Sequence, residues 1–248
     1  MILEVSALSK AFGGVEAVSS VGFAVDAGEL VAMIGPNGAG KTTCFNILNG
    51  QLAPDAGSVR LEGREIVGLR PREIWRLGVG RTFQITETFA SMTVRENIQT
   101  ALLSRHRRLA DWWTPAARLH GEQAGALLGL VGMLDQAERA CSALAYGDLK
   151  RVELAIAIAN EPRLLLMDEP TAGMAATERS DIMALASGIA RERSIAVLFT
   201  EHDMDVVFAH ADRIVVLHRG RLIAQGRPAE VRADPEVRRI YLGQGGNA

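Results

Sequence analysis

Residues 35–43 read Gly-Pro-Asn-Gly-Ala-Gly-Lys-Thr-Thr, and this run constrains the fold more than any other part of the chain. It follows the apolar segment Leu30–Ile34, which is typical of a parallel strand buried on both faces. It precedes a helix that we expect from about Lys41 to Leu48, ending at Asn49-Gly50. Glycines between a strand and a helix let successive backbone N–H groups surround a phosphate, and the helix N-terminus adds positive partial charge. The spacing therefore predicts a phosphate loop.

In such a loop, Lys41 reaches the β- and γ-phosphates of a nucleotide, and the Thr42 hydroxyl binds Mg²⁺. The alternative, a chance glycine-rich turn, does not explain why the run lies between an apolar strand and a helix. The residues that we expect to bind the nucleotide here are Gly35, Pro36, Asn37, Gly38, Ala39, Gly40, Lys41, Thr42 and Thr43.

Composition narrows the protein class. The 27 basic residues include only three lysines, so a lysine inside the phosphate pattern stands out. The formal net charge of −2 gives no support to a nucleic-acid binder that relies on overall basicity. With 248 residues, 48% of them hydrophobic, the chain can bury a core, which excludes disorder and a disulfide-stabilised miniprotein. Cys44 and Cys141 are far apart and lack neighbours at metal-binding spacing, so we expect two buried thiols.

Hydropathy predicts that the chain does not cross a membrane by itself. The first residues, Met1–Val5, include an acid and alternate like a strand, so they do not resemble a secretory signal. The longest nearly apolar stretch, Leu127–Leu134, is far shorter than the roughly 18 residues that a spanning helix needs.

Periodicity predicts an α/β fold with a mostly parallel sheet and an antiparallel N-terminal portion. Residues 94–139 change to helical periodicity, which indicates an inserted helical subdomain; another helix carries Leu149, Val152 and Ile156 on one face and stops at Asn160. A further helical segment is expected around Ile182–Ile189. The expected strands are Ile2–Val5, Val21–Val25, Leu30–Ile34, Val59–Leu61, Leu164–Met167, Ile195–Thr200, and the hairpin of Ile214–Leu217 with Arg221–Ala224.

Two carboxylates, Asp168 and Glu169, follow the apolar segment Leu164–Met167. Placing two charges at the end of a buried strand is costly unless a cation or a reacting group meets them. Asp168 fits a ligand of Mg²⁺, directly or through water, and Glu169 fits a general base for an attacking water. The alternative is a solvated helix cap after a core strand.

His202 and Gln84 are candidates with weaker local support. His202 lies just past the strand Ile195–Thr200, where it could contact a γ-phosphate, although a lone histidine is more often a surface or capping residue. Gln84 is a neutral side chain that could contact Mg²⁺ or water, and nothing in its neighbourhood supports that role.

Taken together and in this order, these motifs resemble the nucleotide-binding subunits of ATP-binding cassette (ABC) transporters over essentially the whole chain. The resemblance implies a phosphate-binding NTPase (RecA-like) core, ATP and Mg²⁺ as cofactors, and Phe12 stacking on adenine. It implies one ABC ATPase domain over residues 1–248, with an ATP-binding core (1–93 and about 150–248) and a helical subdomain (about 94–149). It assigns catalytic roles to Glu169, His202 and Gln84. It also implies that Thr42, Gln84 and Asp168 bind Mg²⁺. The signature that acts on the partner's ATP is Leu144, Ala145, Tyr146, Gly147 and Asp148.

Finer features are similar to the ATPase subunits of branched-chain amino-acid importers. These features include Phe12-Gly13-Gly14-Val15, the Tyr146-Gly147 signature and the C-terminal Tyr241-Leu242-Gly243. Importers of urea or short amides resemble these proteins closely. An exporter ATPase for lipid or lipopolysaccharide shares the catalytic motifs, and a soluble ABC ATPase acting outside transport is a third possibility.

The family resemblance also implies partners and a place in the cell. Two ATPase subunits sandwich two ATP molecules, and they act on two transmembrane permeases and, indirectly, on a substrate-binding protein. Nucleic acid is not expected. The subunit is expected at the cytoplasmic face of the inner membrane.

Two departures from the family pattern affect the partner's ATP site. The usual signature is Leu-Ser-Gly-Gly-Gln, whereas this chain has Ala145 in place of the serine, and Ala175 replaces an Asp that acts across the dimer. These departures predict a heterodimer with unequal sites, although a homodimer is possible. The cluster Arg105–Arg108 is either a lipid contact or a solvated helix face, and Trp112-Trp113 is either a membrane-partner anchor or subdomain core.

Overall fold

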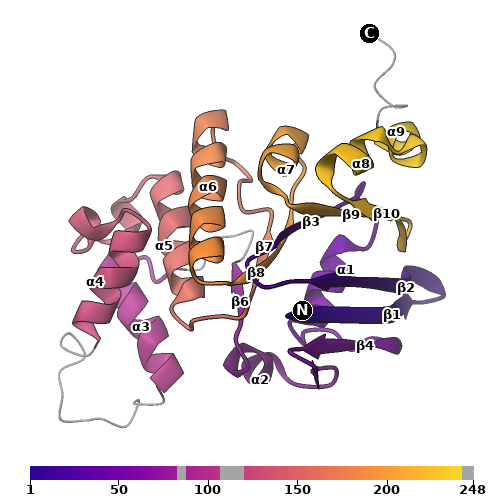
Figure 1. Cartoon of the computed structure of the whole chain (residues 1–248). Helices are drawn as coiled ribbons and strands as arrows, with labels where there is room; N and C mark the ends of the chain where they lie inside the picture. The colour runs from indigo at the N-terminus through magenta and orange to yellow at the C-terminus, as the bar shows by residue number, and fades with distance from the viewer. Residues whose placement is uncertain (83–87, 107–119, 242–248) are drawn as a thin grey trace.

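A computed structural model describes residues 1–82, 88–106 and 120–241. A six-stranded sheet forms its centre, in the order β10-β9-β3-β8-β7-β6 (Figure 1). The five strands from β9 to β6 run parallel, and β10 pairs antiparallel with β9. The strands are β3 Leu30–Ile34, β6 Val79–Thr82, β7 Leu164–Asp168, β8 Ala196–Thr200, β9 Arg213–His218 and β10 Arg221–Gly226.

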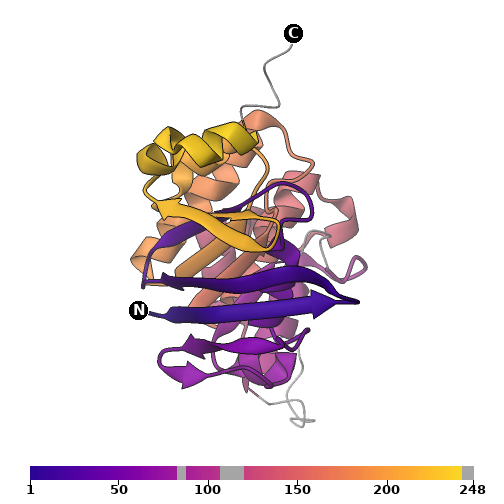
Figure 2. The ribbon, with the colours of Figure 1, turned by 90° about the vertical axis from the view of Figure 1, so that its right-hand side faces the viewer.

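A second, antiparallel sheet is built from the N-terminal part, in the order β2-β1-β4-β5. Figure 2 shows this second sheet below the β9–β10 hairpin and the C-terminal helices. Its strands are β1 Leu3–Phe12, β2 Val15–Val25, β4 Ala56–Leu61 and β5 Arg64–Glu65. The mostly parallel core with an antiparallel N-terminal portion is therefore confirmed.

Helices cover the central sheet and build the part of the chain between β6 and β7. The described helices are α1 Lys41–Leu48, α2 Pro71–Arg76, α3 Val94–His106, α4 Gly121–Leu130, α5 Tyr146–Ile158, α6 Ala176–Glu192, α7 Met204–His210, α8 Pro228–Ala233 and α9 Pro235–Tyr241. Helices α3, α4 and α5 pack on one another, as the helical periodicity of this region predicts. The boundaries of the helical subdomain stay a prediction.

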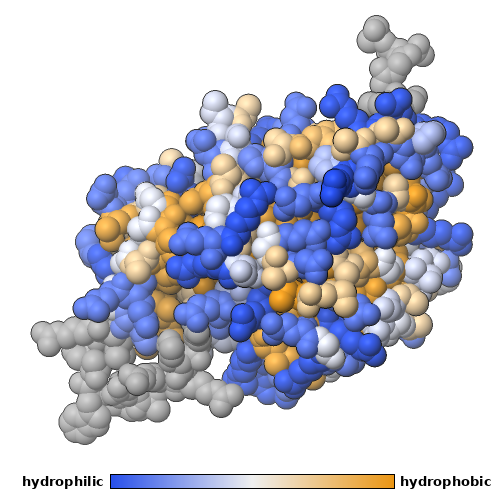
Figure 3. All heavy atoms as spheres, in the orientation of Figure 1, coloured by the Kyte–Doolittle hydropathy of each residue, from blue (hydrophilic) through white to orange (hydrophobic). Residues whose placement is uncertain are grey.

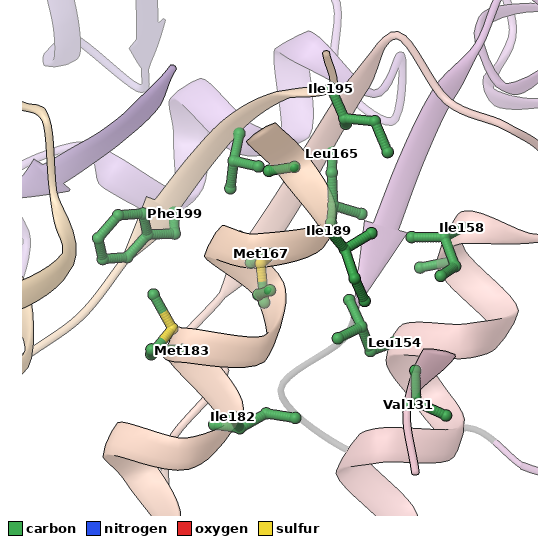
Figure 4. Packing of buried hydrophobic residues seen from close by; sticks show 14 of the residues in the cluster. Val131, Leu154, Ile158, Leu165, Met167, Ile182, Met183, Ile189, Ile195 and Phe199 are labelled. Atoms are coloured by element: carbon green, nitrogen blue, oxygen red, sulfur yellow. The ribbon is translucent and has the colours of Figure 1, made fainter. Parts of the chain in front are cut away.

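Two hydrophobic clusters lie on opposite faces of the central sheet because successive side chains of a strand point to opposite sides. In β3, Leu30, Ala32 and Ile34 join the cluster under the helical region, whereas Val31 and Met33 join the cluster toward the N-terminal sheet. Figure 4 shows part of the first cluster, to which α5 contributes Ile158, α6 contributes Ile189, and the sheet contributes Leu165 and Phe199.

The surface is mixed in character. In Figure 3 hydrophobic residues reach the surface in small groups separated by hydrophilic ones. In the part of the chain that the structure describes, no helix has the length and hydrophobicity needed to span a bilayer. Cys44 and Cys141 are free and buried as expected, and burial raises the pKa of the Cys44 thiol to about 12.

The first two strands are longer than the predicted Ile2–Val5 and Val21–Val25. They pair with several register shifts, and Ala7 and Ser20 have positive φ values of 49° and 51°. Such irregularities interrupt the alternation of hydrophobic and polar residues, so periodicity detects only the regular end of the hairpin. The helix expected to carry Leu149, Val152 and Ile156 is α5, which begins at Tyr146 with Ala145 at its N-cap.

Candidate nucleotide-binding site

A cavity of about 280 Å³ lies at the carboxyl ends of β3, β7 and β8. This edge is where ligands bind in open parallel sheets. The cavity joins segments that are far apart in the sequence, because the parallel strands end side by side. It is lined by Phe12, Ala17, Asn37, Gly38, Ala39, Gly40, Lys41, Thr42, Thr43, Asp168, Glu169 and His202.

The phosphate-loop glycines are required by close backbone packing. Gly40 has a φ of +105°, and a Cβ atom there would collide with the Ala17 carbonyl oxygen. A Cβ atom on Gly35 would collide with the Leu217 carbonyl oxygen. A Cβ atom on Gly38 would meet no atom within 4 Å, but the φ of +78° at this position favours glycine. These contacts fold the loop back over the N-terminus of α1, the geometry that suits an anion.

Lys41 is held inside this loop. It is 8% exposed, and its Nζ donates to the carbonyl oxygen of Gly35 at 2.6 Å and to that of Pro36 at 3.3 Å. Burial lowers the pKa of Lys41, and the opposing carboxylates of Glu169 and Asp168 act against this shift. A hydrogen bond from this buried ammonium to a charged phosphate oxygen would be stronger than its hydrogen bonds to neutral carbonyl oxygens.

Asp168 and Glu169 are positioned by Thr200 of the neighbouring strand. The Thr200 hydroxyl donates to Asp168 Oδ1 at 2.8 Å and accepts the Glu169 N–H at 3.0 Å. Glu169 has a φ of +48°, a strained value for a residue with a Cβ atom, and such strain is common at active sites. The Thr200 hydrogen bond holds the backbone in this conformation at the point where the strand ends.

The Glu169 side chain faces His202. Its Oε1 lies 2.8 Å from His202 Nε2, and the His202 side chain is half exposed toward the cavity that both residues line. A carboxylate paired with an imidazole at the edge of a phosphate site can orient and deprotonate a water. Both residues were predicted to lie here, and the structure brings them together.

The other side of Asp168 meets Arg81. An Arg81 guanidinium nitrogen lies 3.3 Å from Asp168 Oδ2, and both side chains are mostly buried. The same guanidinium donates to Asn46 Oδ1 and to Gln51 Oε1, each at 3.2 Å. Burial lowers the pKa of Arg81, and the Asp168 charge acts in the opposite direction. Arg81 thus links β6 to β7 and to α1.

The oxygen ligands present fit Mg²⁺. Thr42 and Asp168 line the same cavity, and hydroxyl and carboxylate oxygens are the donors that this ion prefers. Among residues 1–82, 88–106 and 120–241, no group of three or more His, Cys, Asp or Glu side chains could hold a metal ion alone. That donor set suits an ion that keeps water and phosphate oxygens rather than one held in a protein cage.

Phe12 lies at the mouth of the cavity, at the end of β1. Its side chain is 50% exposed and its ring centroid is 5.6 Å from Lys10 Nζ. A phenylalanine that belongs to the core is normally buried, whereas a ring that stacks on a base needs an exposed face. Gln84, Arg107-Arg108, Trp112-Trp113 and the side chain of Arg105 lie outside the described residues.

The signature residues Leu144–Asp148 do not line this cavity. Ala145 is the N-cap of α5, and Tyr146 and Gly147 in its first turn lie against the segment that contains Ala175. A Cβ atom on Gly147 would lie 3.3 Å from Glu178 Oε1, and one on Gly173 would lie 3.5 Å from the Tyr146 ring. Tyr146 itself is 42% exposed. The two departures from the family pattern therefore belong to one neighbourhood on the surface.

The sequence reasoning missed Thr200 and Arg81 as site residues. Thr200 was predicted only as the end of a strand, and Arg81 was not singled out. The available signal for Thr200 was its place at the carboxyl end of a strand adjacent to the one that ends at Asp168.

Comparison with known proteins decides the family. The family model described as "ABC transporter" matches residues 18–172, which contain the phosphate loop, the signature and the Asp168-Glu169 pair. The chain belongs to the ABC transporter ATPases. A second family model, described as "Branched-chain amino acid ATP-binding cassette transporter", matches residues 221–247 of this ABC ATPase.

Relatives of known family are similar to this ABC ATPase over almost its full length. It is 42% identical to the high-affinity branched-chain amino acid transport ATP-binding protein BraF of Pseudomonas aeruginosa, over 98% of both chains. It is 38% identical to the ATP-binding protein LivG of Escherichia coli, also over 98% of both chains. Among solved structures, the ADP conformation of MJ1267, an ATP-binding cassette of an ABC transporter, has a TM-score of 0.87 and 32% identity over 98% of both chains.

Proposed function

We propose that this ABC ATPase hydrolyses ATP to drive import of branched-chain amino acids through a membrane complex. The observation that carries the hydrolytic part is that the phosphate loop, Glu169 and His202 line one cavity. The amino-acid cargo is supported by the relatives BraF and LivG, whose names state this transport function, and by the family match over residues 221–247.

In the proposed mechanism, the loop from Gly35 to Thr43 surrounds the phosphates with backbone N–H groups, except at Pro36, which has none, and Lys41 neutralises the β- and γ-phosphates. Phe12 stacks on the adenine. Thr42, Asp168 and Gln84 hold Mg²⁺, which neutralises phosphate charge when it is bound. Glu169 accepts a proton from the attacking water, and His202 keeps the Glu169 carboxylate in place through the 2.8 Å contact.

The signature Leu144, Ala145, Tyr146, Gly147 and Asp148 acts on the ATP held by a second ATPase subunit. Backbone N–H groups at the start of α5 supply donors for a γ-phosphate, as at other helix N-termini. ATP is thereby the ligand that favours the closed dimer, and hydrolysis reopens it. We place residues 1–93 and about 150–248 in the ATP-binding core and about 94–149 in a helical subdomain that contacts two permeases at the cytoplasmic face of the inner membrane. A substrate-binding protein delivers the cargo to these permeases.

Ala145 and Ala175 support a heterodimer with unequal sites. An alanine at the serine position of the signature removes one charge-assisted hydrogen bond to the partner's γ-phosphate, worth about 1.5–3 kcal/mol. This chain's own phosphate loop and Glu169 keep their complete set of side chains, so its own site is the more active one. Exchanging the catalytic glutamate for glutamine in each subunit separately tests this point: equal losses of ATPase activity would contradict the asymmetry.

The test of the assembly is an affinity purification of this chain from detergent-solubilised native membranes, with mass spectrometry of the bound proteins. We expect two multi-helix permeases and a second, different ATPase. Recovery of the chain with soluble proteins only would overturn the transport role while leaving the ATPase chemistry in place.

A further inference from the structure

A second cavity, of about 350 Å³, lies between α7 and the C-terminal helices α8 and α9. These helices lie next to one another at the end of the molecule that carries β9 and β10 (Figures 1 and 2). Its walls are mainly apolar: Ile34, Met204, Phe208 and Val237 contribute to them. Cavities of this size and character bind small molecules in many proteins.

The rim of this cavity carries charges of both signs. Arg232 and Arg238 from the C-terminal helices and Asp205 from α7 all line it, and all three are exposed residues. The Arg232 guanidinium lies 5.5 Å from the Phe208 ring centroid, so it covers part of the apolar wall. Arg238 Nε donates to the Arg232 carbonyl oxygen at 2.9 Å. The terminal nitrogens of Arg238 have no hydrogen-bond partner among the described residues, and they suit a carboxylate.

Tyr241 adds a polar group beside the apolar wall. It lines the cavity, and its hydroxyl is buried without a hydrogen-bond partner within residues 1–82, 88–106 and 120–241. Burying a hydroxyl without a hydrogen-bond partner destabilises the folded chain, and a ligand that accepts its hydrogen bond would remove this cost.

We propose that this cavity is a binding site for a small zwitterionic amino acid with an aliphatic side chain. The side chain would lie against Phe208 and Val237, the carboxylate would pair with Arg238, and the ammonium group would pair with Asp205. A purely anionic or purely cationic amphiphile would satisfy only one half of the rim. The choice of leucine as the probe rests on the proposed function, whereas the site itself does not.

The position of the cavity couples it to ATP binding. Ile34 directly precedes Gly35 of the phosphate loop, and Met204 follows His202 by two residues. A ligand packed against both residues therefore restrains both loops of the nucleotide site. By linkage, a ligand that changes the Kd for ATP has its own Kd changed by ATP by the same factor.

The test is binding of L-leucine to the purified full-length chain, measured by calorimetry and by thermal unfolding. At ten times its Kd, leucine should raise Tm by about 3–5 °C. Arg238→Ala should weaken leucine binding at least about tenfold, because it removes the charge-assisted bonds to the carboxylate. The matched control is Arg239→Ala, which changes the adjacent exposed residue on α9, and Arg239 lines a different cavity.

Two further compounds, compared with leucine, define the ligand class. Glycine, which lacks an aliphatic side chain, and 4-methylpentanoate, which lacks the ammonium group, should both bind at least tenfold more weakly than leucine. Absence of leucine binding, equal affinities of the Arg238→Ala and Arg239→Ala chains, or equal binding of leucine and 4-methylpentanoate would overturn the site. A Kd for ATP that is the same with and without saturating leucine would overturn the coupling.

These measurements are independent of transport. If the assembled complex moves branched-chain amino acids but the chain binds no leucine, only the second site fails. If the chain binds leucine but the complex moves no amino acid, only the proposed cargo fails.

Discussion

At the scale of single residues, the site depends on a threonine that no sequence motif singles out. Thr200 is 1% exposed and its hydroxyl serves both carboxylate-bearing residues at the end of β7. The phosphate loop, Asp168 and Glu169 were predicted because each belongs to a local pattern, and His202 was assigned through the family resemblance. Thr200 could not be predicted as a site residue, because its role depends on the pairing of β7 with β8. That pairing brings together residues 32 positions apart in the chain.

Replacing Thr200 with valine should therefore impair catalysis more than nucleotide binding. The substitution keeps the shape but removes two hydrogen bonds, one of them to a carboxylate, so we expect kcat for ATP to fall about 10–100-fold with KM changed less than about threefold. Thr200→Ser keeps the hydroxyl and should retain most of the activity. Steady-state ATPase assays measure both quantities, and equal activities of the valine and serine variants would contradict the positioning role.

At the scale of elements, α5 contains a buried ion pair that patterns of hydrophobicity do not reveal. Lys150 Nζ lies 3.0 Å from Glu153 Oε2, and the two side chains are 3% and 8% exposed. Helical periodicity predicted an apolar face of α5 that includes Val152 and Ile156. Val152 is buried and Ile156 only partly so, and the buried surface of α5 extends beyond that face to Leu154, Ala155 and Ile158. The periodicity gave no indication of the pair, because charges at this spacing are usually solvated on a helix surface.

Breaking this pair should destabilise the fold. Glu153→Leu removes the carboxylate that lies 3.0 Å from the buried Lys150 ammonium, so we expect a loss of about 3–5 kcal/mol in the free energy of unfolding. The double variant Lys150→Met with Glu153→Leu removes both charges and should recover most of that loss. Denaturant unfolding of the three chains measures the effect, and a single variant as stable as the unchanged chain would disprove it.

Helix α7 should make the stability of the protein sensitive to acid. Burial lowers the pKa of His210, the last residue of α7, below its ordinary value of 6.5, and the Arg191 charge adds to this shift. The unfolded chain therefore binds a proton at His210 more readily than the folded chain. Stability is unaffected by this residue well above pH 6.5 and falls as the pH drops from 6.5 toward the lowered folded pKa.

We expect His210→Gln to reduce this loss. The measurement is the free energy of unfolding of both chains at pH 7.5 and pH 5.5, compared as a difference so that other titrating groups cancel. A difference between the chains that does not change with pH would refute the assignment to His210.

At the scale of the whole molecule, the order of the motifs was enough to predict the family and the mostly parallel core. The β1–β2 hairpin was predicted too short because register shifts at Ala7 and Ser20 break its alternation. The short helices α8 and α9 were not predicted, since six or seven residues give too little periodicity to recognise. The second cavity depends on those helices, so no reading of the sequence could have located it.

Hydrolysis at Glu169 should power amino-acid uptake by the assembled complex. The direct measurement is ATP-dependent uptake of radiolabelled leucine by the purified complex in proteoliposomes, with its substrate-binding protein added, for the native chain and for Glu169→Gln. Because general-base catalysis contributes roughly 10²–10⁴-fold, the variant should bind ATP normally but lose at least 99% of both ATPase activity and uptake. Uptake by the variant at the native rate, or an active ATPase that moves no branched-chain amino acid, would contradict the account.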